Sequence, residues 1–475
     1  MKNKAIELSF LKSALTTDSS LMPTANFLTW MKAKREAVNV KITAVPFDAM
    51  KHWGFHPTTS NLVHSSGRFF SIEGIRVKTD WGAVKEWDQP IINQPEIGFL
   101  GIITKKFDGV LHFLMQAKIE PGNINFVQLS PTLQATKSNY TKVHKGATPL
   151  YLEYFRENLD QQKVLLDQLQ SEQGARFLKK RNRNIIIEVE EDVEVYDNFC
   201  WLTLGQIKLL LLHDNTINMD TRTVISGIPF GDYPNEVIDL FSTLKSINTF
   251  NNHFEHGLLM SALNKDAGLH NMESLISWIT RLKSMYELEV RRIPLNRVKK
   301  WQQDEYTIFH DEKKYFSVIA VLAEIDNREV HSWMQPLVKS AQEGLIAFVV
   351  KKINGVYHFL VQAKLESGNF DIIELAPTVQ CLTGNYRKTL SPPFLEYVLN
   401  VKPEQIRYNT QQSEEGGRFY REQNHNLIVE AEDDFPIKVP ENYRWMTVNQ
   451  LNVFIKFNNF LNIQARSLIA SIKFV

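Results

Sequence analysis

The chain of 475 residues contains the same sequence twice. Residues 109–140 read GVLHFLMQAKIEPGNINFVQLSPTLQATKSNY, and residues 355–386 read GVYHFLVQAKLESGNFDIIELAPTVQCLTGNY. The two segments align without a gap at an offset of 246, with 17 of 32 positions identical. Each copy spans about 200 residues, which is longer than the unit of a solenoid array, so the pattern predicts two duplicated globular modules.

The repeat extends in both directions from this segment. Upstream, WDQPII from Trp87 matches WMQPLV from Trp333. Downstream, SEQGARF from Ser171 matches SEEGGRF from Ser413, and WLTLGQI from Trp201 matches WMTVNQL. We expect a first module over residues 1–228, a connecting segment over residues 229–270 and a second module over residues 271–475.

Local patterns predict an α+β fold for each module. Apolar residues recur at three- and four-residue spacing over residues 27–39 and 275–288, which indicates an opening helix. Residues 111–120 alternate and are followed, after the turn at 121–123, by residues 126–134, which predicts an antiparallel hairpin. The expected class is a mixed or antiparallel sheet with flanking helices.

Three further elements are expected downstream of the hairpin. We predict a helix over residues 160–170, a strand over residues 185–190 and a closing helix in each copy. Each closing helix begins with a capping-box pattern, in which a threonine is followed three residues later by a glutamine. The residues concerned are Thr203, Gln206, Thr447 and Gln450.

Composition excludes several classes of function. Lys and Arg total 54 and Asp and Glu total 53, so a net charge of +1 gives no reason to expect binding to nucleic acid or to a membrane surface. The two cysteines, Cys200 and Cys381, have apolar neighbours and are expected to be small core residues. Neither an 18-residue apolar stretch nor a signal-peptide pattern is present, so we expect a cytoplasmic protein.

The first strand of the hairpin carries a row of polar residues on one face, because side chains alternate along a strand. These residues recur in both copies, although apolar neighbours differ. They offer an acid or base, an anion-binding amine and a carboxylate, which favours a binding face over a solvent-exposed sheet surface, the alternative interpretation. The row and its facing glutamine comprise His112, Gln116, Lys118, Glu120 and Gln134, and His358, Gln362, Lys364, Glu366 and Gln380.

Other repeated polar residues are also candidates. The pairs Asn139-Tyr140 and Asn385-Tyr386 end the repeated block, where each tyrosine is either an acid or donor or a packed side chain. Arg176 and Arg418 follow SEQG and SEEG, and the planar guanidinium suits a diphosphate. A run with Lys179, Arg181 and Arg183 and the side chain of Trp87 complete the set, the alternatives being a solvated surface and a core aromatic.

Several catalytic motifs are missing from the sequence. It has no G-x-G-x-x-G after a predicted strand, no P-loop, no zinc-binding pattern and no G-x-S-x-G. We therefore expect chemistry without nicotinamide, pyridoxal phosphate, a metal or a nucleophilic serine.

The segments FLMQAKIEPGNINFVQLSPTLQATKSNYTKVH, SEQGARFLKKRNRN and WLTLGQIKLLL, the last followed by N-x-x-N-M-D-T-R, resemble the NDP-hexose 2,3-dehydratase family. The resemblance runs from about Phe27 to the end of the chain. It implies two Nudix-like modules, a homodimer and a dTDP-4-keto-6-deoxyglucose substrate. An intact Nudix box is missing, so Nudix hydrolase activity is not implied, and the second copy departs further, with Ser367 in place of Pro121.

The implied reaction needs a base for the C3 proton, which the C4 ketone acidifies, and an acid for the departing C2 hydroxyl. The product is a 3,4-diketo-2,6-dideoxy sugar, expected to pass to a 3-ketoreductase. One module is expected to dominate catalysis, with the first favoured. The catalytic candidates are His112, Lys118, Glu120 and Tyr140 or their counterparts His358, Lys364, Glu366 and Tyr386. Substrate contacts are expected from Trp87, Gln116, Gln134, Asn139, Arg176, Lys179, Arg181, Arg183, Gln362, Gln380, Asn385 and Arg418.

Two other functions fit the same sequence. One is a nucleotide-sugar-binding protein without chemistry. The other is a hydrolase of nucleotide derivatives, against which the missing Nudix box counts.

Overall fold

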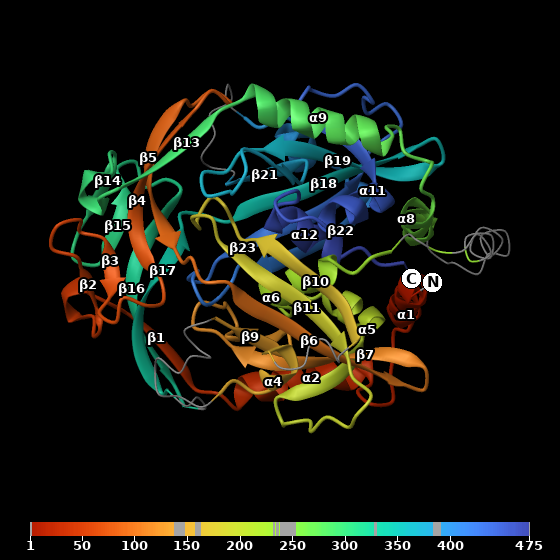
Figure 1. Cartoon of the computed structure of the whole chain (residues 1–475), viewed down its shortest axis with the longest axis horizontal. Helices are drawn as coiled ribbons and strands as arrows, with labels where there is room; N and C mark the ends of the chain where they lie inside the picture. Colours follow the sequence, from red (N-terminus) through yellow and green to blue (C-terminus); the bar gives the residue numbers. More distant parts are fainter. Residues whose placement is uncertain are drawn as a thin grey trace.

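The computed structural model describes residues 2–136, 148–156, 163–230, 233, 237, 253–326, 330–382 and 391–474. The chain forms two similar halves, each contributing one large and one small sheet (Figure 1). The predicted α+β class is confirmed. Four candidate residues, Asn139, Tyr140, Asn385 and Tyr386, lie outside the described residues.

The large sheet of each half has seven strands in the same order. In the first half the order is β10-β11-β6-β7-β12, with β8 on β7 and β9 on β6; β6 and β11 are parallel and the other pairs antiparallel. These strands are β6 (Gly98–Phe107), β7 (Val110–Ile119), β8 (Val127–Ser130), β9 (Leu133–Ala135), β10 (Lys163–Ser171), β11 (Arg181–Glu188) and β12 (Phe199–Thr203). Their counterparts are β18 (Gly344–Ile353), β19 (Val356–Lys364), β20 (Glu374–Ala376), β21 (Val379–Leu382), β22 (Ile406–Ser413), β23 (Gln423–Glu430) and β24 (Tyr443–Thr447).

The two small sheets exchange a strand between the halves. Strand β1 pairs with β16 of the second half, and β13 pairs with β4 of the first. The repeats are therefore interlocked at this side of the molecule, on the left of Figure 1. The strands are β1 (Val40–Val45), β2 (Trp53–Phe55), β3 (Leu62–His64), β4 (Ser71–Thr79) and β5 (Glu86–Asn93), and β13 (Leu288–Ile293), β14 (Trp301–Gln303), β15 (Thr307–His310), β16 (Phe316–Ile325) and β17 (Ser332–Ser340).

The helices repeat as well. Helix α8, within the expected connecting segment, packs on β19 and α11 as α1 packs on β7 and α5. Ser13 and Ser261 make the same two bonds, each joining a strand carbonyl to the first turn of a helix. The principal helices are α1 (Lys2–Leu15), α2 (Thr24–Glu36), α4 (Glu153–Arg156), α5 (Leu204–Leu210), α6 (Met219–Ser226), α8 (His253–Leu263), α9 (Met272–Met285), α10 (Leu395–Leu399), α11 (Val448–Ile455) and α12 (Ile463–Ala470).

Several local predictions are confirmed. The opening helices are α2 and α9, and both capping boxes are formed, at Thr203 and at Thr447. The hairpin is formed by β7 and β8, but its second strand divides at Pro131. Proline donates no backbone bond, and the chain there leaves β7 to pair β9 with β6.

One predicted helix is wrong. Residues 163–171 form β10, whereas residues 160–162 lie outside the described part. Strand β10 pairs along its length with β11, whose Ile185, Ile186 and Ile187 are fully buried. Pairing against a buried strand outweighs the weak local preference for a helix.

Both faces of the large sheet are covered. Phe113 and Met115 of β7 lie in the main core, as predicted, while Leu114 on the other face packs in a second core with Tyr151 and Phe155. The polar row is therefore not a solvent-exposed sheet surface. Cys200 and Cys381 are buried and unpaired, as expected.

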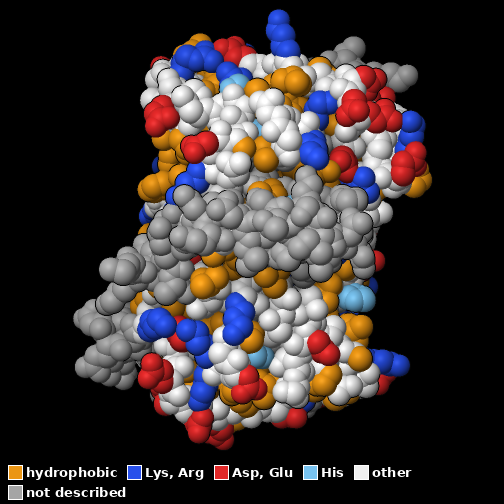
Figure 2. Space-filling model, turned by 90° about the vertical axis from the view of Figure 1, so that its right-hand side faces the viewer, with side chains coloured by type: hydrophobic (Ala, Val, Ile, Leu, Met, Phe, Trp, Pro, Cys, Tyr) orange, Lys and Arg blue, Asp and Glu red, His pale blue; other side chains and the backbone are white. Residues whose placement is uncertain are grey.

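On the face drawn in Figure 2, Lys and Arg side chains are interspersed with Asp and Glu, so no large area of that face carries charge of one sign. Among the described helices, none is long and apolar enough to span a membrane.

Candidate active site

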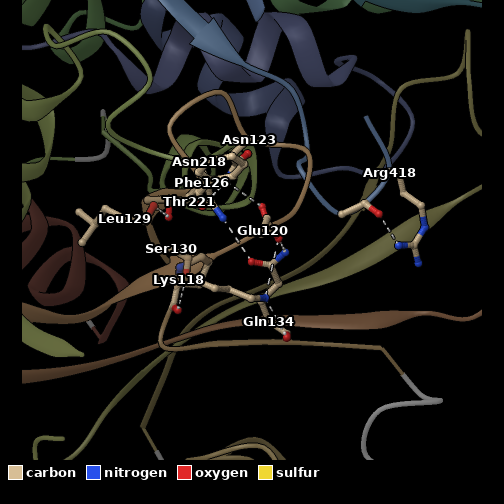
Figure 3. A network of polar contacts seen from close by, with 12 residues as sticks. Lys118, Glu120, Asn123, Phe126, Leu129, Ser130, Gln134, Asn218, Thr221 and Arg418 are labelled. Atoms are coloured by element: carbon tan, nitrogen blue, oxygen red, sulfur yellow. Dashed lines mark hydrogen bonds and ion pairs between the residues drawn. The ribbon is translucent and has the colours of Figure 1, made fainter. Parts of the chain in front are cut away.

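A chain of three polar side chains ends at Glu120, directly after β7 (Figure 3). The Glu120 carboxylate is buried and accepts a hydrogen bond from Gln134 Nε2 at 2.7 Å. Gln134 Oε1 in turn accepts from Asn218 Nδ2 at 3.2 Å. Lys118 Nζ lies 3.9 Å from Glu120 Oε1.

The start of α6 determines which atoms donate and which accept in this row of three side chains. Asn218 is the N-cap, and its Oδ1 accepts the backbone N–H of Thr221 at 2.8 Å. Its amide group is therefore left to donate, so Gln134 accepts with its oxygen and donates with its nitrogen. The helix cap thereby orients Gln134 so that its side-chain N–H donates to Glu120.

The second half contributes a loop, residues 413–419, to this same place. The backbone N–H of Gly122, in the turn after Glu120, donates to the carbonyl of Gly416 at 2.8 Å. The loop carries Glu415 and Arg418. Arg418 stacks 4.2 Å from the ring centroid of Phe70 and donates from Nη1 to the carbonyl of Gly417 at 2.8 Å.

A residue of the first half also holds the guanidinium of Arg418. Its Nε donates to Gln94 Oε1 at 3.3 Å, and in Figure 3 the Arg418 side chain lies to the right of the Glu120 cluster, with no interaction drawn between them. Its Nη2 has no hydrogen-bond partner among the described residues. One edge of the guanidinium is therefore available to an anion.

Two carboxylates in this site are held in an unusual state. Burial, followed by repulsion from Glu415, Glu172 and Glu120, raises the pKa of Asp220 well above its ordinary value, against the pull of Lys118. Burial also raises the pKa of Glu415 to about 7, with Arg418 opposing it and Glu172 and Glu120 adding to it. Within the described part of the chain, neither carboxylate has a hydrogen-bond partner. We refer to Lys118, Glu120, Gln134, Asn218, Asp220, Glu415 and Arg418 as the first site.

The equivalent residues of the second half form a second site. Gln380 Nε2 donates to Glu366 Oε1 at 2.8 Å, and Asn462 Nδ2 donates to Gln380 Oε1 at 2.7 Å. Lys364 stands where the first site has Lys118, and its Nζ donates to the carbonyl of Gln380 at 3.2 Å. Arg176 of the first half stacks 4.2 Å from the centroid of Phe316.

The second site has no counterpart of Asp220 or Glu415, although burial raises the pKa of Glu374, a neighbour of Glu366, to about 7. Gln464 replaces Asp220, and Gln173 replaces Glu415. Gln464 donates from Nε2 to Glu414 Oε1 at 2.9 Å, so its amide is used within the protein. The two sites share their hydrogen-bonded frame and differ in their titrating groups.

The two predicted histidines do not join either site. His112 and Glu120 are separated by eight residues of extended chain, about 26 Å. Ser19 Oγ lies 2.8 Å from His112 Nε2, and the carbonyl of Val110 lies 2.9 Å from Nδ1. Burial lowers the pKa of His112, with the Val110 bond opposing it.

His358 occupies the same position in the second half. Its Nε2 accepts the backbone N–H of Leu269 at 2.9 Å, and its Nδ1 lies 3.1 Å from the carbonyl of Val356. Burial lowers the pKa of His358 to about 4. Both imidazoles are held within the protein at both ring nitrogens.

The expected cationic run is dispersed. Arg181 stacks on Phe370 at 4.0 Å, Arg183 is paired with Asp167 and Lys179 is exposed. Of the cations in this run, Lys180 acts on the first site, although it was not among the expected contacts. Its charge opposes the rise in the pKa of Glu415 that burial causes.

Three other expected contacts have internal roles. Trp87 Nε1 donates to Gln89, whose Nε2 donates to the carbonyl of Ala175 at 3.0 Å. Gln362 donates to the carbonyl of Pro377 at 2.8 Å. Gln116 lies on β7 between β8 and β12 and is partly buried.

Sequence reasoning missed Asn218, Asp220 and Glu415. Asn218 and Asp220 lie inside the quoted N-x-x-N-M-D-T-R, and Glu415 lies in SEEG. Identity between the two copies marks the polar row, whereas Asp220 and Glu415 are positions at which the copies differ. A comparison of differing positions would have identified them.

No group of three or more His, Cys, Asp or Glu able to hold a metal ion occurs among the described residues. The site consists of carboxylates, amides and cations arranged for proton transfer and anion binding.

Comparison with known proteins agrees with this chemistry. A family model described as NDP-hexose 2,3-dehydratase matches residues 24–228 and 272–472. A dTDP-4-dehydro-6-deoxy-alpha-D-glucopyranose 2,3-dehydratase of Saccharopolyspora spinosa is 47% identical over 466 residues, covering 98% of this chain and 94% of the relative.

Proteins with the same description from Amycolatopsis orientalis and Streptomyces violaceoruber are 44% and 43% identical, over 97% and 95% of this chain and 92% and 97% of their own lengths. The matches extend across both copies of the repeat. The chain belongs to the NDP-hexose 2,3-dehydratase family.

Proposed function

We propose that the protein removes water from a dTDP-4-keto-6-deoxyhexose, taking the proton from C3 and the hydroxyl from C2. The family and the names of three relatives support the substrate and the bond that is broken. The observation that carries the proposal is the hydrogen bond from Gly122 to Gly416, which seats the loop carrying Glu415 against the first half, where the charge of Glu415 raises the pKa of Asp220.

Glu415 is the proposed base. A base works best when its pKa lies near the working pH, and burial raises the pKa of Glu415 to about 7. At neutral pH a large share of this carboxylate is ionised and able to take the C3 proton. The electron pair passes to the C4 ketone, giving an enolate.

Asp220 is the proposed acid. Its pKa is raised well above the ordinary value by burial and by three neighbouring carboxylates, which favours its protonated form. It donates this proton to the C2 hydroxyl, which leaves as water when the enolate collapses to a C2–C3 double bond. The resulting enol tautomerises to the 3,4-diketo-2,6-dideoxy sugar.

The remaining groups bind charge. Lys118, held beside Glu120, is placed to donate to the C4 oxygen as negative charge develops there. Arg418 presents Nη2 to the diphosphate, while its other nitrogens are held by Gln94 and Gly417. Glu120 holds Lys118 in place through the 3.9 Å contact between Lys118 Nζ and Glu120 Oε1.

We assign the reaction to the first site rather than the second. The second site keeps Lys364, Glu366 and Arg176 but has glutamine where the acid and the base would be. An amide neither takes nor gives a proton near neutral pH. The four histidine and tyrosine candidates are not needed for this scheme.

Other aspects rest on the family resemblance alone. They are a Nudix-like origin of each large sheet with its helices, a homodimer, and transfer of the unstable diketone to a 3-ketoreductase. A cytoplasmic location stays a prediction from the sequence. A diketone of this kind is reactive, which favours rapid consumption by a reductase.

The test uses purified protein and dTDP-4-keto-6-deoxyglucose without added cofactor, with loss of water followed by mass spectrometry. Asp220→Asn and Glu415→Gln keep shape and remove titration, and each should lower kcat by about 100- to 10,000-fold. Glu366→Gln, in the second site, should leave kcat close to that of the unchanged protein.

Substrate binding separates the alternatives. If the unchanged protein binds the sugar nucleotide but forms no product, it is a binding protein without chemistry. If Glu366→Gln alone abolishes turnover, the second site is the active one.

A further inference from the structure

A fully buried arginine joins the two segments that form the first site. Arg222 lies in α6, two residues after Asp220, and is 1% exposed. Its Nη1 donates to the carbonyl of Ile217 and to Gln412 Oε1 at 3.1 Å, and its Nη2 donates to the carbonyl of Ser413. Its Nε donates to Ser467 Oγ at 2.8 Å.

These acceptors lie beside the catalytic groups. Ile217 directly precedes Asn218, the cap that orients Gln134 and Glu120. Ser413 begins the loop that carries Glu415 and Arg418. One planar guanidinium is thus bonded to the base-bearing loop of the second half and to the helix start that holds the acid in the first.

We propose that Arg222 is a positioning residue for the elimination, because its fork fixes the Glu415–Arg418 loop against Asp220. The inference rests on the proposed function and adds to it a residue that touches neither substrate nor reacting atoms.

The groups that accept hydrogen bonds from Arg222 indicate that it acts by holding backbone segments in place rather than through its charge. None of its hydrogen-bond acceptors is a carboxylate: they are backbone carbonyls, an amide oxygen, a hydroxyl and the sulfur of Met219. Burying a charged group costs free energy even where carboxylates such as Glu414 and Asp220 lie near it, so stability alone is a poor reason for an arginine here. Several donors in one rigid plane do, however, fix two backbone carbonyls relative to each other.

The second half provides a matched control. Arg466, in α12, is equally buried and donates to the carbonyls of Ser171 and Leu461 and, from Nε, to Thr223 Oγ1 at 3.1 Å. Ser171 begins the other loop, which carries Gln173 and Arg176 to the second site. Arg222 and Arg466 therefore make equivalent bonds and serve different sites.

The experiment compares Arg222→Lys with Arg466→Lys in the full chain. Lysine keeps the positive charge, so its effect on nearby carboxylates remains, but it loses the planar fork. For each variant we would measure kcat and KM for dTDP-4-keto-6-deoxyglucose, the pH dependence of kcat, and the midpoint of thermal unfolding.

We expect both midpoints to fall by similar amounts. Only Arg222→Lys should lower kcat, by about 10- to 100-fold, because small displacements of a catalytic group have effects of that size. Its acidic limb should also move to lower pH, since a loosened Glu415 becomes more hydrated and its pKa falls towards the ordinary range. Glu172, Glu120, Asp220, Lys180 and Arg418 face this carboxylate and stay unchanged in both variants.

Equal losses of kcat in the two variants, or a loss in Arg466→Lys alone, would overturn the positioning role. If Arg222→Lys does not fold, Ser467→Ala removes one acceptor of the same guanidinium and should lower kcat in the same direction; unchanged kcat there would also overturn it. Failure of the proposed function is seen separately, as absence of product from the unchanged protein.

Discussion

Gly122 and Gly416 meet across the boundary between the two halves, where the Gly122 N–H donates to the Gly416 carbonyl at 2.8 Å. Gly368 and Gly174 make the same bond at 2.7 Å. Each half thereby inserts its loop into the site of the other, so neither half contains a complete first or second site.

This close approach predicts that Gly122→Ala is poorly tolerated. A Cβ at position 122 would lie 1.7 Å from the carbonyl oxygen of Phe419, which is backbone and cannot rotate away. We expect a loss of at least about 1–3 kcal/mol in the free energy of unfolding, typical of overpacking, together with reduced kcat.

Gly54→Ala is the control, because a Cβ there meets no atom within 4 Å. Denaturant unfolding of the two variants tests the prediction. Equal stability of both would show that the loop moves freely.

The rate should depend on pH through Glu415. As a base it must be ionised, so kcat/KM should fall as the pH decreases through about 7, the raised pKa of this carboxylate. The pH profile of the unchanged protein should show this limb, and the residual activity of Glu415→Gln should lack it. A profile that is flat from pH 5 to pH 8 would remove Glu415 from the mechanism.

The histidines should affect stability rather than turnover. The folded-state pKa of His358 is lowered to about 4 by burial, below the ordinary value of about 6.5. Its neutral form therefore stabilises the fold above pH 6.5, and that contribution is lost as the pH falls towards 4.

His358→Asn should reduce the loss of stability between pH 6.5 and pH 4 while kcat stays near normal, and His112→Asn should also retain kcat. Thermal unfolding at several pH values, with initial rates measured beside it, tests both statements. A large fall in kcat in a variant that still folds would show that the histidines take part in the reaction.

Turnover should need no added NAD, pyridoxal phosphate or metal. The substrate's C4 ketone accepts the electron pair from C3, so the elimination involves no net oxidation or reduction. Chelator treatment and exhaustive dialysis should leave kcat unchanged. Activity that disappears and returns only with a divalent cation would require a different scheme.

Local sequence patterns were sufficient for much of the architecture. The capping boxes at Thr203 and Thr447 and the alternation around Phe113 depend on neighbours within a few residues, and both were predicted correctly. The same alternation placed Lys118 and Glu120 on one side of their strand. It also grouped His112 with them, because a period of two says which face a residue shares but not how far along the strand it lies.

The internal repeat determined, without any structure, that the chain is a duplication with the same row of polar residues in both copies. Tertiary structure alone decided which residues complete each frame. Glu415 and Asp220 are nearly 200 residues apart in sequence, and only the crossing of the halves brings them together. Burial is the main cause of both raised pKa values; the charges of Glu415, Glu172 and Glu120 add to it at Asp220, and those of Glu172 and Glu120 add to it at Glu415. These are properties of the folded arrangement and not of either segment.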